Sequence, residues 1–263
     1  MAHINLTGQR LEYEFVGPSR VHGPTLVFLH EGLGSVALWK DFPLKVAVAT
    51  GCRALMYSRY GYGSSSPLTA PREPDFMHVE ALNILPQLLS ALQITDPVLF
   101  GHSDGASIAL INAGAAPHPP RGLIVMAPHV MVEDVCVTSI SAAKQTYEMT
   151  NWREKLRRYH DDPDGAFRGW CDIWLDHRFR HWNIEELLPG ITCPVLAIQG
   201  LDDEYGTMEQ IDRIARAIQS AELLKLPACG HSPHRDHPDA VISAVALHVE
   251  RIRHTPPHIT EPD

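Results

Sequence analysis

The chain has 263 residues, of which 44% are hydrophobic and 20% are charged. This length and composition allow a substantial buried core, and they predict one large domain with room for an inserted subdomain. The formal net charge of −9 gives no electrostatic basis for binding nucleic acid or an anionic membrane. The first residues show no basic segment followed by an apolar stretch, and no apolar run reaches the ~18 residues of a membrane span. We therefore expect a soluble protein without a signal peptide.

Short apolar runs alternate with helical patterns along the chain. The expected strands are residues 11–16, 25–30, 52–57, 98–101, 122–127, 194–199 and 222–226. Helical spacing occupies residues 76–93, 207–220 and 239–252, where Pro86 should kink the first helix and Thr207 should cap the second. Continuous apolar strands that alternate with helices predict a mostly parallel sheet covered on both faces. In such sheets the active site lies beyond the carboxyl ends of the strands.

One segment interrupts this alternation. Residues 131–190 carry helical patterns but no convincing strand. We interpret them as a helical cap inserted into a core formed by residues 1–130 and 191–253. The polar, proline-rich residues 254–263 are expected to be a disordered tail.

The cap segment is rich in tryptophan. Four of the five tryptophans of the chain lie in it: Trp152, Trp170, Trp174 and Trp182. Most of them are expected to form the cap's own core. A subset, Trp170 and Trp174, together with His129, is predicted to line an apolar substrate pocket.

The cysteines are scattered and odd in number. They are Cys52, Cys136, Cys171, Cys193 and Cys229. Without a C-x-x-C pair, such a set is typical of reduced thiols in the core. The cysteines therefore favour a cytoplasmic protein.

The most informative motif is Gly-His-Ser-Asp-Gly at residues 101–105. It follows the apolar run 97–100 and precedes the helical run 106–111. A G-x-S-x-G between a strand and a helix is typical of a nucleophile elbow, whose tight turn projects the serine hydroxyl from the sheet edge. Ser103 is therefore the predicted nucleophile, although a chance match in a glycine-rich turn is the alternative.

A serine hydroxyl needs a base, usually an imidazole that a carboxylate orients. In the elbow fold the order along the chain is serine, acid, histidine. His231 follows the last strand and is the predicted base, with His234 and His237 as nearby competitors. The histidine-rich stretch 231–237 also suggests a metal site, but its spacing matches no metal motif. We expect its members to be solvated surface residues and predict no metal.

The acid is less sharply defined by the sequence. Asp203 fits best, because it lies three residues past Gly200 at the end of a predicted strand. Asp202 or Glu204 would serve if the turn differed by one residue. If the acid follows the preceding strand instead, Glu133 or Asp134 is the candidate.

An oxyanion intermediate needs hydrogen-bond donors. The backbone N–H of the residue after the nucleophile, Asp104, is one expected donor. The second is expected from the loop His-Glu-Gly-Leu-Gly at residues 30–34, where the backbone N–H of Gly32 is the best candidate. A plain glycine-rich turn is the alternative for this loop.

Together these segments resemble the α/β-hydrolase superfamily, and specifically its small capped members. The resemblance covers roughly residues 20–250. It is carried by residues 30–34, 61–65 (Gly-Tyr-Gly-Ser-Ser), 101–105, 200–203 and 230–231. It implies a central eight-stranded sheet, a helical lid and Ser-His-Asp hydrolysis without metal or cofactor.

The chain departs from many relatives at two positions. Glu31 stands where a second glycine is common, which puts a carboxylate beside the oxyanion loop and the pocket. Asp104 stands where an apolar or amide residue is common. The Ser-Asp-Gly elbow is similar to that of valacyclovir-hydrolase-like enzymes, which take amino-acid esters, and this resemblance would allow Asp104 to pair with a substrate cation. The interpretation that we favour is that Asp104 hydrogen-bonds nearby backbone.

The expected reaction is hydrolysis of a small carboxylic ester through an acyl-enzyme, with a small molecule as the only expected partner. Hydrolysis of a carbon–carbon bond in a ring-cleavage product is the alternative, followed by thioester or enol-lactone hydrolysis, because one triad serves all of these. Serine at the elbow argues against dehalogenase or epoxide-hydrolase chemistry, since those relatives have an aspartate there. A sensor of small ligands on the same fold is the non-enzymatic alternative. The oligomeric state is left open.

Overall fold

The fold is described by a computed structural model, which covers residues 1–18 and 23–254. The tail predicted for residues 254–263 therefore lies outside the described residues, apart from His254. The strands are β1 (Ala2–Leu6), β2 (Gln9–Val16), β3 (Thr25–Leu29), β4 (Arg53–Ser58), β5 (Pro97–His102), β6 (Gly122–Met126), β7 (Val195–Gly200) and β8 (Glu222–Leu226). Within the described ranges they form one eight-stranded sheet in the order β1-β2-β4-β3-β5-β6-β7-β8.

The pairing pattern confirms the predicted mostly parallel sheet. Strands β4, β3, β5, β6, β7 and β8 pair in parallel, whereas β1–β2 and β2–β4 are antiparallel pairs. The edge strand β1 was not predicted. It forms a hairpin with β2 through Thr7 and Gly8, both at positive φ (49° and 81°), as a tight type I′-like turn requires. Its largely exposed sequence Ala-His-Ile-Asn-Leu alternates apolar with polar residues, so it lacks the continuous apolar run by which the buried strands were predicted.

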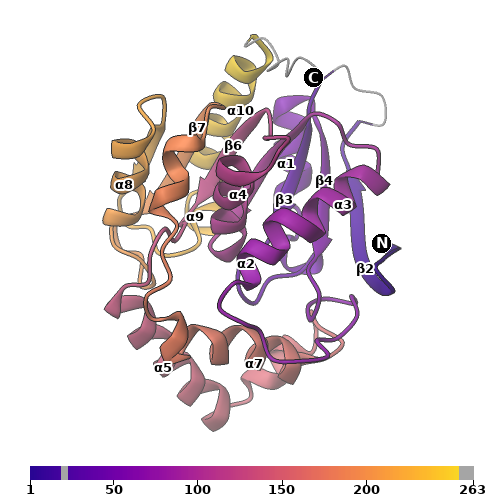
Figure 1. Ribbon diagram of the computed structural model, residues 1–263, viewed down its shortest axis with the longest axis vertical. Coiled ribbons are helices and arrows are strands. Elements are labelled where there is room, and N and C mark those ends of the chain that lie inside the picture. Colours follow the sequence, from indigo (N-terminus) through magenta and orange to yellow (C-terminus); the bar gives the residue numbers. More distant parts are fainter. Residues whose placement is uncertain (19–22, 255–263) are drawn as a thin grey trace.

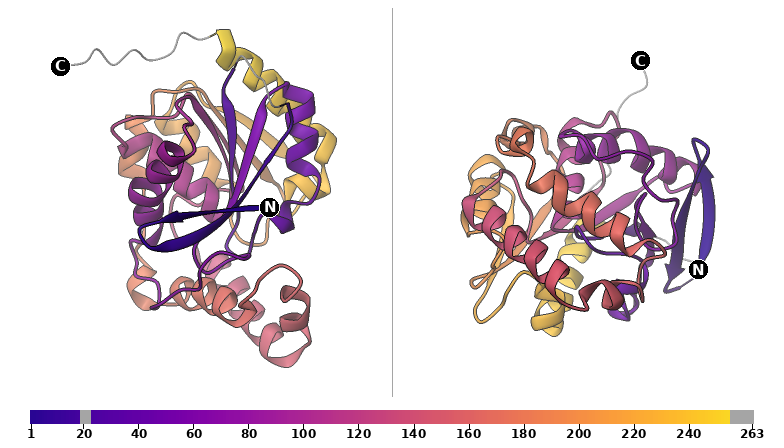
Figure 2. Two further views of the ribbon diagram at one scale, coloured as in Figure 1. Left: turned by 90° about the vertical axis from the view of Figure 1, so that its right-hand side faces the viewer. Right: turned by 90° about the horizontal axis from the view of Figure 1, so that it is seen from below.

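Helices cover both faces of the sheet (Figure 1 and Figure 2). The α-helices of the described residues are α1 (Phe42–Thr50), α2 (Phe76–Val79), α3 (Leu85–Ala91), α4 (Asp104–Ala115), α5 (Asp134–Met149), α6 (Trp152–Leu156), α7 (Pro163–Trp174), α8 (Glu209–Ala217), α9 (Pro233–Asp236) and α10 (Pro238–His254). In the left view of Figure 2, α1 and α10 lie together on one face, and α2, α3 and α4 lie on the other.

Alternation along the strands separates two apolar cores. In β3, Val27 and Leu29 join the core beneath α2, α3 and α4. Leu26 and Phe28 point the other way, into the core beneath α1 and α10. Because successive side chains of a strand face opposite sides, both faces of a sheet covered in this way must be apolar. This is why β3 and β5 appear in the sequence as continuous apolar runs.

The helix predicted over residues 76–93 is interrupted. A π-helical turn, η2 (Glu80–Ile84), separates α2 from α3, and Pro86 lies in the first turn of α3. Proline has no backbone N–H to donate and its ring crowds the carbonyl four residues earlier, so the regular hydrogen-bond register cannot continue through it. The predicted distortion of the helix at Pro86 is thus present, and it takes the form of the wider π-helical turn η2 just before the proline.

The second predicted helix is shorter than expected. Residues 207–220 were expected to be helical with Thr207 as the cap, but α8 runs from Glu209 to Ala217 and Met208 occupies the cap position. The Thr207 hydroxyl still accepts a 3.3 Å hydrogen bond from the backbone N–H of Glu209. Thr207 is itself held by Glu133, which accepts from its backbone N–H at 2.9 Å.

Residues 131–190 form helices rather than strands of the sheet. In Figure 1, α5 and α7 lie together at one end of the sheet. The 3₁₀ turn η3 (His177–Phe179) follows α7, and η4 (Glu185–Gly190) leads back to β7. η4 packs against α4 of the core, close enough that a Cβ on Gly114 would lie 2.5 Å from the Leu187 carbonyl oxygen. The last turn of the predicted cap therefore lies on the core rather than over the sheet end.

Candidate active site

Ser103 lies in a strained turn between β5 and α4. Its φ is 53° and its ψ is −119°, a region that L residues rarely occupy and that is characteristic of functional turns. The turn closes only because its flanking residues lack side chains. A Cβ on Gly101 would lie 2.3 Å from the Gly105 carbonyl oxygen, and one on Gly105 would lie 2.1 Å from the Leu29 carbonyl oxygen. Ser103 Oγ is thereby presented at the carboxyl ends of the strands.

Three predicted residues meet around this hydroxyl. Ser103 Oγ lies 2.9 Å from Nε2 of His231, and Nδ1 of His231 lies 2.8 Å from Oδ1 of Asp203. A carboxylate only accepts hydrogen bonds, so Nδ1 of His231 carries the proton and Nε2 is free to accept from the serine. The chain order and the geometry are those of a nucleophile, a base and an orienting acid.

The electrostatics of the pair favour the same arrangement. Burial lowers the pKa of His231, but the hydrogen bond and charge of Asp203 outweigh burial, so the pKa of His231 lies above its ordinary value. Burial raises the pKa of Asp203, yet the bond to His231 prevails and the pKa of Asp203 lies below its ordinary value. The carboxylate therefore stays charged and stabilises the imidazolium that forms when the serine proton is taken.

The other candidate acids bind groups other than the His231 ring or are exposed to solvent. Glu204 accepts from the backbone N–H of His231 at 3.1 Å, not from its ring. Glu133 accepts from Thr207 and Gln210, and Asp134 pairs with Arg180. Asp202 is exposed.

The competing histidines lie apart from Ser103. His237 Nε2 donates to the Ala228 carbonyl at 3.2 Å. His234 is 5% exposed and packs against Trp39 and Phe42, with ring centroids 5.3 Å apart in both cases. The expectation that this stretch is solvated is wrong for His234, because α9 turns the ring into the core beside α1. In the described ranges, no group of three or more metal-ligating side chains could hold an ion.

The two residues expected to supply the oxyanion donors border the same cavity as Ser103. Asp104 is the first residue of α4, where a backbone N–H has no partner within the helix. Gly32 lies in the loop after β3, and it faces the cap so closely that a Cβ there would lie 2.1 Å from Cδ1 of Trp170. Only glycine fits at this position.

A buried arginine, which we did not predict, holds the loop that carries Gly32. The Arg59 side chain is 1% exposed, and its guanidinium donates to the carbonyl oxygens of His30 and Glu31. Its backbone N–H donates to His30 Nε2 at 3.0 Å, and His30 Nδ1 in turn donates to the Glu31 carbonyl at 2.7 Å. Burial and the Arg59 charge keep the pKa of His30 well below its usual range, so the ring is neutral. The one available sequence signal was a charged residue directly after β4.

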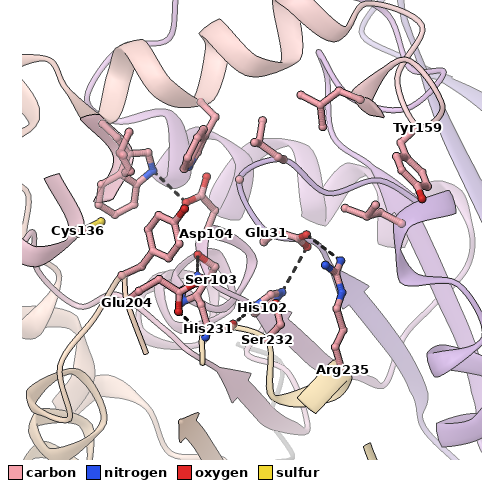
Figure 3. A pocket seen from close by; sticks show the side chains of 18 of the residues that line it. Glu31, His102, Ser103, Asp104, Cys136, Tyr159, Glu204, His231, Ser232 and Arg235 are labelled. Carbon is pink, nitrogen blue, oxygen red and sulfur yellow. Dashed lines mark hydrogen bonds and ion pairs between the residues drawn. The ribbon is translucent and has the colours of Figure 1, made fainter. Parts of the chain in front are cut away.

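His102 is a second residue of the site for which the sequence indicated no role. It lies inside the elbow, and its Nε2 donates to the His231 carbonyl at 2.7 Å. Its Nδ1 faces Glu31 at 3.4 Å, and Glu31 also faces Arg235 at 3.6 Å (Figure 3). Glu31 therefore lines the pocket as predicted, but its carboxylate is paired with protein groups. No sequence pattern indicated the contact between His102 and Glu31, because the two residues are 71 positions apart in the chain.

A cavity of about 360 Å³ opens above Ser103. The predicted residues Glu31, His129, Trp170 and Trp174 all border it, and the walls combine core residues with side chains from α5, α6 and α7. Trp152 also borders the cavity, whereas Trp182 packs behind Trp174. Burial lowers the pKa of His129 to about 3, so its ring stays neutral and adds no charge to the pocket.

Asp104 lies at the cavity wall with its side chain buried. Its Oδ1 accepts from the indole Nε1 of Trp174 at 3.1 Å, and its Oδ2 lies 3.8 Å from Nη2 of Arg59. Neither interaction is with backbone, so the expectation of a backbone hydrogen bond is wrong. α7 brings an indole to a carboxylate 70 residues away, which no local pattern could indicate.

Comparisons with known proteins agree with this fold. The sequence profile of the alpha/beta hydrolase family matches residues 26–244. Mouse Serine hydrolase BPHL is 26% identical over 248 residues, covering 89% of this chain and 80% of that protein. Human Serine hydrolase BPHL is 27% identical over 182 residues, covering 66% of this chain and 61% of that protein, which is less than two thirds of its length.

Solved structures share the fold at low sequence identity. The alpha/beta hydrolase MGS-M2 from a Medee basin deep-sea metagenome library aligns with a TM-score of 0.75 at 22% identity, over 100% of this chain and 99% of that one. The enol-lactonase from Burkholderia xenovorans LB400 aligns with a TM-score of 0.73 at 18% identity, over 95% of this chain and 100% of that one. The resemblance to the α/β-hydrolase superfamily is therefore confirmed: the protein belongs to the alpha/beta hydrolase family.

Proposed function

We propose that this protein is a serine hydrolase that cleaves small carboxylic esters through an acyl-enzyme. The observation that carries the proposal is the continuous contact from Ser103 Oγ to His231 Nε2 at 2.9 Å and from His231 Nδ1 to Asp203 at 2.8 Å. The mouse relative is named a serine hydrolase, and Esterase YbfF of Escherichia coli is 23% identical over 194 residues. Both names support the same class of reaction.

In the first half-reaction, Ser103 Oγ attacks the carbonyl carbon of the ester while His231 Nε2 takes its proton. The carbonyl oxygen becomes an oxyanion that accepts hydrogen bonds from the backbone N–H groups of Gly32 and Asp104. When the intermediate collapses, the carbon–oxygen bond to the alcohol breaks. His231 gives its proton to the departing alcohol, which leaves Ser103 acylated.

Water completes the reaction. His231 Nε2 takes a proton from a water molecule that attacks the acyl carbon, and a second oxyanion forms at the same donors. Its collapse breaks the bond to Ser103 Oγ, which recovers its proton from His231, and the carboxylic acid leaves. Asp203 stays ionised throughout and holds the imidazole in the tautomer that both halves need.

Pocket size and lining point to the substrate class. A volume of about 360 Å³ is near the lower end for ligand sites. The acidic groups Glu31 and Asp104 already face protein cations or donors, and three tryptophans from α6 and α7 border the cavity. A small neutral ester with an apolar or aromatic part under the cap fits these features best.

The working compartment is part of the proposal. The five cysteines are buried and unpaired, which suits a reducing cytoplasm. Among the described residues, no helix is both long enough and apolar enough to cross a membrane.

The test combines labelling with a substrate panel. A serine-directed fluorophosphonate should modify Ser103, and p-nitrophenyl acetate and butyrate should be hydrolysed. Turnover of ring-cleavage diketones in preference to these esters would assign carbon–carbon hydrolysis, and preference for acyl thioesters or enol-lactones would assign those reactions. Tight ligand binding with neither labelling nor turnover would indicate a sensor and contradict the proposal.

A further inference from the structure

One helix of the cap touches both residues that supply the oxyanion donors. Trp170 and Trp174 are four positions apart in α7 and therefore share a face of the helix. The indole of Trp170 packs directly on Gly32, leaving no room for a Cβ. The indole N–H of Trp174 donates to the carboxylate of Asp104 at 3.1 Å.

The other carboxylate oxygen of Asp104 faces Arg59. The carboxylate and the guanidinium are both 1% exposed, and Nη2 of Arg59 lies 3.8 Å from Oδ2 of Asp104. The same guanidinium donates to the carbonyls of His30 and Glu31, the two residues that precede Gly32. A chain of polar contacts thus runs from Trp174 through Asp104 and Arg59 to the loop of Gly32.

This chain joins two loops that come from different strands. Gly32 follows β3 and Asp104 follows β5, so the separation of their N–H groups depends on tertiary contacts and not on local backbone geometry. Oxyanion stabilisation requires donors that are placed before the charge develops, and it falls steeply when they shift. Because Trp174 belongs to the cap, the position of α7 enters this placement directly.

We propose that the Asp104 carboxylate, held between Trp174 of the cap and Arg59 beneath the site, is a junction that fixes the spacing of the two oxyanion donors. The inference rests on the proposed ester hydrolysis. In this inference the side chains of Trp174, Asp104 and Arg59 are positioning groups. The backbone N–H of Asp104, in contrast, is itself one of the two oxyanion donors. The inference also opposes the view that the Asp104 side chain binds a cationic substrate, since Oδ1 already accepts from Trp174 and Oδ2, which has no hydrogen-bond partner in the described residues, faces the Arg59 guanidinium at 3.8 Å.

The first test compares two tryptophans of the same aromatic cluster. Trp174→Phe removes the indole N–H that binds Asp104. Trp182→Phe is the matched control, because Trp182 lies 6.4 Å from Trp174 between ring centroids and, in the described residues, its buried Nε1 has no hydrogen-bond partner. Both variants are assayed with p-nitrophenyl acetate and with a methyl trifluoromethyl ketone, which forms a tetrahedral adduct at the serine.

Trp174→Phe should lower kcat about tenfold, which is less than the ~10²- to 10³-fold loss on removal of a whole oxyanion donor. The inhibition constant of the ketone should rise in parallel while KM changes less than about twofold, since the lost interaction matters chiefly in the transition state. Trp182→Phe should leave kcat and the inhibition constant unchanged. Equal effects of the two variants, or a change confined to KM, would overturn the inference.

A second variant separates the junction from a cation site. Asp104→Asn keeps an oxygen for the Trp174 indole but removes the charge that faces Arg59. It should reduce hydrolysis of neutral and amino-acid esters by the same factor. A loss confined to amino-acid esters would assign Asp104 to the substrate and overturn the inference.

Wild-type turnover and Ser103 labelling are measured first. Their absence would contradict the proposed function. Normal wild-type turnover combined with equal effects of the two tryptophan variants would contradict only the junction.

Discussion

Ser103 and His231 are separated by 128 positions in the sequence, yet Oγ of the first lies 2.9 Å from Nε2 of the second. The Ser103 hydroxyl lies in the elbow after β5, and the His231 imidazole lies in the loop after β8. His102, the neighbour of Ser103, donates to the His231 carbonyl at 2.7 Å. The two loops are therefore joined through both a side-chain contact and a backbone contact.

Replacing Ser103 by Ala should abolish most catalysis, because the nucleophile is lost. We expect kcat for p-nitrophenyl esters to fall by ~10⁴- to 10⁶-fold while the fold is retained. Circular dichroism checks the fold, and fluorophosphonate labelling should disappear. A decrease of less than tenfold would remove Ser103 from its assigned role.

Replacing His231 by Ala should cost nearly as much as losing the serine, because residues of a triad act as a unit. His237→Ala is the matched control, since His237 follows the same strand but donates only to the Ala228 carbonyl. It should leave kcat within about twofold. His234→Ala should instead lower Tm, because it empties a buried site beside Trp39. If His234→Ala or His237→Ala removed turnover and His231→Ala did not, the base would be reassigned.

The pH profile should show a single acid limb governed by His231. The base must be neutral to accept the serine proton, so kcat/KM is lost as the pH falls through the His231 pKa. Because Asp203 raises that pKa, the limb should lie above the ordinary value of 6.5. Asp203→Asn should lower kcat by ~10⁴-fold and move the limb to lower pH. A limb that stays in place would show that Asp203 does not orient the base.

Adding a methyl group to Gly32 should disturb the oxyanion loop. In Gly32→Ala the new Cβ would overlap the Trp170 indole, so the loop or α7 must shift, and we expect a loss of ~10²-fold or more in kcat. The double variant Gly32→Ala/Trp170→Ala should recover part of that loss relative to Trp170→Ala alone. Strictly additive effects in this double-mutant cycle would argue against the contact.

The strain at Ser103 should be measurable as stability. Its φ of 53° and ψ of −119° suit glycine better than any residue with a Cβ, and such strain costs about 1–3 kcal/mol. Ser103→Gly should therefore be more stable than Ser103→Ala by about 1 kcal/mol, measured by urea unfolding. The two inactive variants differ by one methyl group, so equal stabilities would contradict the strain.

Much of the fold could be predicted because strands and helices depend on short-range patterns. The apolar run in β5 and the glycines at 101 and 105 indicated the elbow directly. β1 escaped detection because its ladder with β2, and not its own composition, makes it a strand. His234 was misplaced for a related reason: its burial depends on Trp39 and Phe42, which lie about 190 positions away in the chain.

The sequence by itself determined the order of the candidate nucleophile, acid and base, and the strand ends at which they lie, because each is encoded within a few neighbouring residues. Only the tertiary structure decided which aspartate meets the histidine, what holds the Gly32 loop, and where the Asp104 carboxylate points. Those choices arise from contacts between side chains many positions apart, such as Trp174 with Asp104. Local periodicity cannot indicate such contacts, since they form only when the cap and the sheet have packed together.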